Sequence, residues 1–167
     1  MEGSQQIRDL RLHLCRAGKS EIPGGPSEPA AELAGVEIDL QKIASAYSEI
    51  RKRFNPDVIL LESAGGIYVP LNQREIMADI PARLGIPVII VADAALGTIN
   101  HTVLTINELR RRDVEVRGVI VNRVPDDPGI LIRDNFKMIE KLGRTEILAL
   151  AGTNRGFIND LGLRHIF

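Results

Sequence analysis

Short apolar runs alternate with longer stretches of helical periodicity along most of this 167-residue chain. Each apolar run is continuous rather than alternating with polar residues, which is typical of strands that are covered on both faces. We therefore expect four buried strands, the fourth being the last strand of the chain. Their residues are Val58 to Leu61, Pro87 to Ala92, Val116 to Val121 and Glu146 to Leu150.

The stretches between these runs place apolar residues three and four positions apart, as one face of an α-helix does. Asp39 is expected to cap the helix that follows it, because an aspartate side chain accepts a hydrogen bond from the first helical turn. The expected helices are residues 5–18, Leu40 to Phe54, Asn72 to Leu84, Thr98 to Arg112 and Ile130 to Leu142. The core positions expected in the fourth helix are Val103, Leu104, Ile106 and Leu109.

Strands that alternate with helices predict an α/β fold, in which a parallel sheet is flanked by helices on both faces. A chain of 167 residues can bury a sufficient core, so residues 1–167 are expected to form a single domain. In such sheets, ligands bind at the carboxyl ends of the strands. The polar residues that follow the expected strands are therefore the main candidates for chemistry.

Composition and charge narrow the classes of partner. The net charge is −1 with both signs mixed, so no basic footprint for nucleic acid or for an anionic membrane is present. No apolar run approaches the ~18 residues of a membrane span, and the polar start MEGSQQ does not resemble a signal peptide. We therefore expect a cytoplasmic protein. The single cysteine, Cys15, excludes an internal disulfide, and Arg110 to Arg112 is interpreted as a solvated helix end.

Glu62 directly follows the first expected strand and precedes two glycines, Gly65 and Gly66. A carboxylate at the tip of a strand is well placed to hold Mg²⁺ beside phosphates, and glycines allow backbone to approach a ligand closely. The alternative is a plain turn with an exposed glutamate, because E-x-x-G-G alone is a weak pattern.

Gly97, Thr98 and Asn100 lie in a Gly-Thr-Ile-Asn-His turn between the second expected strand and the next helix. The free N–H groups of a first helical turn can bind a carboxylate or a phosphate. The alternative is that Thr98 and Asn100 only cap the helix, with Thr98 as the N-cap residue. His101 is interpreted as a structural residue.

Three more polar residues are candidates. Asn122 follows the third expected strand, and its amide offers the donor and the acceptor that match a purine edge, unless it only bonds its own loop. Asp93 could serve a magnesium-bound water or cap the next helix. Asp9, on the first expected helix, could be a second metal ligand or a surface acid. No Ser/His/Asp or Cys/His arrangement is suggested by the spacing, so no catalytic residue is assigned.

Three segments have the order and spacing of a known family's motifs. The chain has SEPAAELAGVEIDLQKI from Ser27, ESAGGIYVPL from Glu62, and PVIIVADAALGTINHTVLTINELRRRDVEVRGVIVNRV from Pro87 to Val124. These segments resemble the S-P-x-x-A-A, E-G-A-G-G-x-x-x-P-L and L-G-x-I-N-H motifs of the dethiobiotin synthetase family. The resemblance covers more than half of the chain and implies the P-loop NTPase-like fold of that family.

The resemblance also implies a function in biotin biosynthesis. Enzymes of this family close the ureido ring of dethiobiotin from 7,8-diaminononanoate and CO₂, using ATP and Mg²⁺. By resemblance, Glu62 and Asp9 would bind the metal, Asn122 would meet adenine, and the region from Gly97 to Arg112 would form a homodimer. The residues that would contact the substrate are Gly65, Gly66, Leu96, Gly97, Thr98 and Asn100.

The sequence departs from the family pattern at both ends. The family begins with a strand and a G-T-D-T-x-V-G-K-T loop, whereas these 167 residues contain no G-x-x-x-x-G-K-[ST] motif, and their last residues lack the family's L-G-x-I-P. That loop supplies cationic and backbone donors to the transferred phosphoryl group, so we expect weak or absent ATP binding and catalysis. Three hypotheses remain: a ligase whose loop was lost through a misassigned start, a non-catalytic dimeric binding or regulatory module, and a subunit completed by another polypeptide.

Overall fold

The computed structural model describes residues 37–153 and 156–160, the latter range for its backbone only. The chain forms two compact units, Met1–Met77 and Ala78–Phe167, which are described separately. The single domain expected over residues 1–167 therefore stays a prediction. The helix expected over residues 5–18 lies outside the described residues.

The first unit contains helix α2 (Leu40–Phe54), as the sequence predicts. Asp39 is its N-cap, and the Asp39 carboxylate accepts a hydrogen bond from the backbone N–H of Gln41 at 2.8 Å. Ile43 is buried on the apolar face. The helix ends at Asn55, which adopts the left-handed conformation and returns its N–H to the carbonyl of Arg51.

The segment from Val58 to Leu61 is not a strand, so this prediction was wrong. It pairs with none of the described strands, and Val58 and Leu60 are 48% and 77% exposed. A strand persists only where its backbone N–H and C=O groups are paired with a neighbour. The apolar character of these four residues predicts burial, but it does not provide that neighbour.

The helix expected from Asn72 begins seven residues later, at Asp79, because Asn72 organises a turn. Its Oδ1 accepts the backbone N–H groups of Arg74 (2.9 Å) and Glu75 (3.0 Å). Its Nδ2 donates to the carbonyl of Ile38 at 2.9 Å. Asparagine side chains compete with a helix in this way, by offering the backbone other hydrogen-bond partners.

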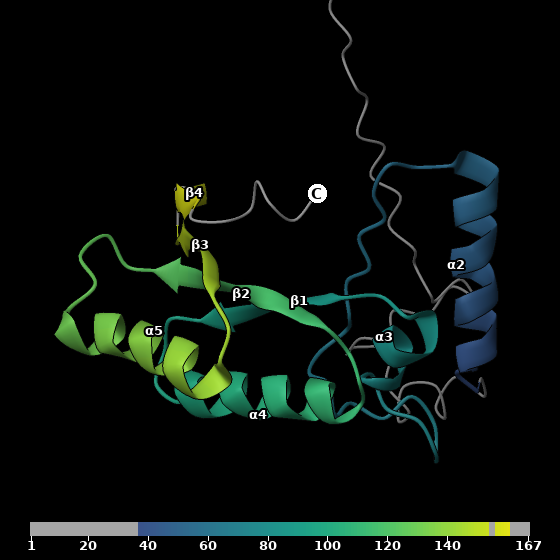
Figure 1. Ribbon diagram of the computed structural model, residues 1–167, viewed down its shortest axis with the longest axis horizontal. Helices are drawn as coiled ribbons and strands as arrows, with labels where there is room; N and C mark the ends of the chain where they lie inside the picture. The colour runs from purple at the N-terminus through teal and green to yellow at the C-terminus, as the bar shows by residue number, and fades with distance from the viewer. Residues whose placement is uncertain (1–36, 154–155, 161–167) are drawn as a thin grey trace, which may run out of the picture. The chain divides into compact units, whose positions relative to one another are not determined.

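The second unit begins with the short helix α3 (Asp79–Leu84) and contains a four-stranded sheet in the order β1-β2-β3-β4 (Figure 1). The parallel strands that the sequence predicts are β1 (Val88–Asp93), β2 (Val116–Val124) and β3 (Ile147–Gly152). β3 is not the last strand, because β4 (Gly156–Asp160) pairs with it in the antiparallel direction. An antiparallel neighbour needs only a short loop, without the crossover helix that marks a parallel strand in a sequence.

Helices α4 (Thr98–Arg111) and α5 (Ile130–Gly143) lie side by side along one face of this sheet (Figure 1). Ile106 and Leu109 are buried as expected, but Val103 is only half-buried and Leu104 is 56% exposed. Leu104 is two residues from the buried Ile106, which places it about 200° away around the helix. The largest fully buried side chains among the described residues, all in α4, β2 and α5, are Ile106, Leu109, Val119, Val121, Val124 and Ile139.

Arg110 and Arg111 are exposed at the end of α4, as the interpretation of a solvated helix end predicts, whereas Arg112 is half-buried, and all three arginines also have polar partners. Arg110 donates to the carbonyls of Gly143 (2.6 Å) and Arg144 (2.8 Å) at the end of α5. Arg111 and Arg112 both contact the carboxylate of Glu108, whose side chain is only 6% exposed. Arg112 also pairs with Asp79 at the start of α3. None of the described helices is both long enough and apolar enough to cross a membrane.

Candidate functional site

The carboxyl ends of β1 and β2 meet, as a parallel sheet requires. Asp93 and Asn122 are register partners at the ends of these strands, and the N–H of Ala94 donates to the carbonyl of Asn122 at 3.0 Å. The Asn122 side chain is exposed, and its Oδ1 accepts the N–H of Arg123 at 2.8 Å. Its Nδ2 has no hydrogen-bond partner among the described residues, so the Asn122 amide can donate to a ligand.

Asp93 neither caps α4 nor stands alone. Its two carboxylate oxygens accept hydrogen bonds from Nε (3.1 Å) and Nη2 (2.7 Å) of Arg123, a two-pronged pair across the ends of β1 and β2. Arg123 has φ of +55°, a conformation that residues other than glycine seldom adopt. Sequence reasoning passed over Arg123, because a single arginine after an expected strand carries no distinctive pattern.

The first turn of α4 forms a second polar feature. Gly97, not Thr98, is the N-cap residue, and its φ of +89° is in the left-handed region that favours glycine. No side chain caps this helix. Thr98 is the first helical residue and only 5% exposed, and its Oγ1 has no hydrogen-bond partner within the part of the chain that the structure describes. A buried hydroxyl without a partner costs free energy, which a bound polar ligand would recover.

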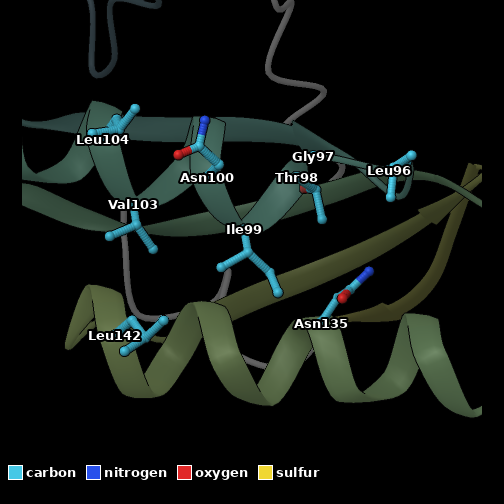
Figure 2. A pocket seen from close by; sticks show the side chains of 9 residues that line it. All are labelled: Leu96, Gly97, Thr98, Ile99, Asn100, Val103, Leu104, Asn135 and Leu142. Carbon is cyan, nitrogen blue, oxygen red and sulfur yellow. The ribbon is translucent and has the colours of Figure 1, made fainter.

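A cavity of about 420 Å³ lies between this turn and α5. Figure 2 shows its side chains, with Asn135 reaching from α5 toward the region of Gly97, Thr98 and Leu96. The cavity brings together four of the six residues that were expected to contact the substrate, namely Leu96, Gly97, Thr98 and Asn100. The remaining lining residues are Ile99, Val103, Leu104, Asn135 and Leu142.

Asn135 is the lining residue that sequence reasoning missed. It lies inside α5, where asparagine is a weak helix former. That unfavourable choice within a strongly amphipathic helix was the available signal, and only the packing of α5 beside α4 gives it meaning. His101 is exposed, and its Cε1 lies 3.2 Å from the position that a Gly97 Cβ would take. The imidazole therefore covers the glycine turn and does not line the cavity, which agrees with a structural role.

The remaining candidates lie in the first unit or outside the described residues. Glu62, Gly65 and Gly66 are exposed, and Gly65 has φ of +85°. The N–H of Val69 donates to the carbonyl of Gly66 at 3.0 Å, so Gly66 opens a tight turn directly after Gly65. No group of three or more His, Cys, Asp or Glu side chains that could hold a metal occurs among the described residues. Asp9 lies outside them.

Comparison with known proteins places this arrangement in a family. A family model described as an AAA domain matches residues 25–152. The ATP-dependent dethiobiotin synthetase BioD of Anaeromyxobacter dehalogenans (strain 2CP-1) is 42% identical over 131 residues, which are 76% of this chain and 57% of the relative. The chain belongs to the dethiobiotin synthetase family. The P-loop NTPase-like fold expected from the resemblance is thereby confirmed.

Two further dethiobiotin synthetases show how far the likeness extends. The enzyme of Methanococcus vannielii is 34% identical over 133 residues, 79% of this chain and 62% of its own length. The enzyme of Clostridium novyi is 34% identical over 142 residues, 83% of this chain and 58% of its own length. The chain thus spans less than two thirds of these dethiobiotin synthetases. Two features lie within the stretch that the family model matches: the cavity at α4, and the rim formed by the carboxyl ends of β1 and β2.

Proposed function

We propose that this chain carries the substrate-tail and nucleobase sites of an ATP-dependent dethiobiotin synthetase. In the proposed reaction, one amine of 7,8-diaminononanoate takes up CO₂ and loses a proton to give a carbamate. A carbamate oxygen attacks the γ-phosphorus of ATP, and ADP leaves. The second amine then attacks the carbonyl carbon, loses a proton and expels phosphate, which closes the ureido ring.

The observation that carries this proposal is the unpartnered Oγ1 of Thr98 at the start of α4. A helix N-terminus bears partial positive charge and free N–H groups, so it stabilises a carboxylate. The buried Thr98 hydroxyl adds one donor, and Asn135 offers a second from across the cavity. Apolar side chains complete the walls, so the cavity suits an aliphatic chain that ends in a carboxylate.

Replacing Thr98 by valine tests this assignment. We expect Thr98→Val to weaken binding of 7,8-diaminononanoate about tenfold, because a hydrogen bond to a charged group contributes about 1.5–3 kcal/mol. The same change should raise the free energy of unfolding by about 1 kcal/mol, since it removes a buried hydroxyl that has no partner in the unbound protein. Isothermal titration calorimetry and urea unfolding measure the two effects.

Thr105→Val is the matched control, since Thr105 lies on the same helix but does not line the cavity. Thr105→Val should leave the affinity for 7,8-diaminononanoate unchanged. It should also not reproduce the gain in the free energy of unfolding that is expected of Thr98→Val. A 7,8-diamine that lacks the carboxylate should bind weakly to every variant. If wild-type protein binds the substrate and the diamine equally well, the cavity does not hold the carboxylate.

Asn122 is proposed to bind the nucleobase, through the Nδ2 that is directed to no described residue. Glu62 is proposed as a ligand of Mg²⁺, with Asp9 as a second. The exposed Glu62 carboxylate fits one such position, because Mg²⁺ beside phosphates takes only one or two protein carboxylates and keeps several waters. When bound, Mg²⁺ would neutralise charge on the phosphate oxygens. No catalytic side chain is assigned.

A homodimer is proposed on the face formed by α4 and α5. Leu96, Leu104 and Leu142 line the cavity and are 101%, 56% and 49% exposed. Clustered exposed apolar side chains are typical of interfaces between proteins. Burial of this cluster against a second copy would also close the cavity around a bound substrate.

Replacing Leu104 by glutamate tests the dimer. We expect Leu104→Glu to convert the protein to a monomer at about 10 μM, because an interface rarely tolerates an unpaired buried charge. Sedimentation velocity measures the change. Leu131→Glu is the control, since Leu131 is 78% exposed on α5 but does not line the cavity. A wild-type protein that stays monomeric at high concentration would refute the proposed interface.

A further inference from the structure

Arg123 is the one described residue other than glycine that has a positive φ away from a helix end. Four of the described residues other than glycine have positive φ, and two of them, Asn55 and Arg144, are the C-caps of α2 and α5. Asp113 follows the C-cap of α4 directly. Left-handed residues are common at such helix ends. Arg123 lies near the end of β2 instead, with φ of +55°, at a bulge where the register with β3 shifts between Val121 and Val124.

The ion pair of Arg123 adds little to the stability of this bulge. The Arg123 and Asp93 side chains are 65% and 42% exposed. Exposed pairs contribute little to stability, because water and salt screen the attraction and two long side chains lose freedom. Bulges are over-represented next to active sites, where they re-aim a side chain. The bulge at Arg123 therefore fits a role of its side chain in binding.

We propose that Arg123 binds a phosphate group of the nucleotide whose base Asn122 holds. This inference rests on the proposed function, which assigns a nucleotide to the rim formed by the ends of β1 and β2. The guanidinium would exchange the Asp93 carboxylate for a phosphate, because its planar fork matches both anions with two parallel hydrogen bonds. In the unbound protein, the Asp93 carboxylate then takes the place of the phosphate and holds the Arg123 guanidinium in position.

Three features of the rim support this exchange. Arg123 directly follows Asn122, and its N–H already donates to the Asn122 side chain at 2.8 Å, so the two groups form one unit. The carboxyl ends of parallel strands are where nucleotides bind in sheets of this kind. The exposure of the pair means that little desolvation opposes release from Asp93.

Titrations of Mg-ATP, adenosine and inorganic triphosphate test the proposal on the full chain by NMR, which detects millimolar affinities. Arg123→Gln should weaken Mg-ATP and triphosphate about tenfold and leave adenosine unchanged, since only the phosphate contact is lost. Asp93→Asn should strengthen both about threefold, because it removes the competing anion. Arg117→Gln is the matched control, as Arg117 also lies on β2 and pairs with an acid, Glu115, at 3.4 Å.

Mg-ATP affinity that is unchanged in Arg123→Gln would overturn the proposal, as would a wild-type chain that binds no Mg-ATP. An equal loss of adenosine affinity would also overturn it, since Arg123 would then act only through Asn122. The proposed function fails differently: wild-type protein would bind neither adenosine nor 7,8-diaminononanoate. Adenosine binding without an Arg123 effect leaves the nucleobase site intact.

A glycine at position 123 separates binding from structure. Arg123→Gly removes the guanidinium but suits a positive φ, so Tm should stay constant or rise while Mg-ATP affinity falls as in Arg123→Gln. A Tm that falls by several degrees with unchanged Mg-ATP affinity would give the pair a purely structural role and would contradict the proposal.

Discussion

Replacing Glu108 by alanine should lower the free energy of unfolding by about 3 kcal/mol, the first of the two largest effects expected in this chain. The Glu108 carboxylate is almost fully buried and accepts hydrogen bonds from Arg111 and from Arg112. Arg112 is only 22% exposed and contacts two carboxylates, those of Glu108 and Asp79. The replacement removes the first of them. Breaking a buried ion pair from one side costs far more than forming it contributes.

Urea unfolding followed by circular dichroism measures this loss, and Tm should fall by about 6–12 °C. Glu115→Ala is the matched control, because Glu115 also pairs with an arginine, but its side chain is 68% exposed. That control should change stability by less than about 0.5 kcal/mol. Equal effects of the two replacements would mean that burial does not decide the strength of the Glu108 cluster.

Replacing Gly118 by alanine should cost about 2–3 kcal/mol, by overpacking the sheet. A Cβ at this position would lie 2.5 Å from Cγ of Leu148 and within 2.6 Å and 2.9 Å of its two Cδ atoms. Leu148 lies on the neighbouring strand β3 and is only 5% exposed, so its side chain has little room to move. Either Leu148 adopts a poor rotamer, or β2 and β3 separate locally.

Two variants make this prediction specific. Gly129→Ala should cost no more than about 1 kcal/mol, from the poorer N-cap of α5 alone, because nothing lies within 4 Å of the Cβ that it would add. The double variant Gly118→Ala/Leu148→Ala should lose less stability than the sum of the two single variants, since the smaller side chain makes room for the new methyl group. Strict additivity in this cycle would show that the cost of Gly118→Ala does not come from Leu148.

Gly118 and Glu108 lie in elements that also carry residues of the proposed sites. Gly118 lies in β2, the strand that carries Asn122 and Arg123 near its carboxyl end. Glu108 lies in α4, the helix whose first turn carries Thr98. We therefore expect these replacements to lower stability without removing a group that touches a ligand. Ligand affinity of the folded fraction should stay close to that of the wild-type protein.

The sequence by itself determined the alternation of parallel strands and helices in the second unit. Continuous apolar runs predict β1, β2 and β3, and helical spacing predicts α4 and α5, as it predicts α2 in the first unit, because these signals depend only on neighbours along the chain. The sequence also indicated that Asn122 lies near the carboxyl end of a strand and that Gly97 follows one, although β2 continues past Asn122 to Val124. Since parallel strands end at one edge, the order of residues along the chain is enough to identify the polar residues at those ends as candidates.

Tertiary structure decided the features that depend on partners far away in sequence. Asn135 lines the cavity because α5 lies beside α4, and Arg123 meets Asp93 because β1 and β2 are neighbours. The segment Val58 to Leu61 shows the converse, since its apolar residues predict a strand although no described strand pairs with them. Periodicity reports which side of an element prefers burial. Which atoms meet there depends on how the elements pack, and local sequence does not encode that choice.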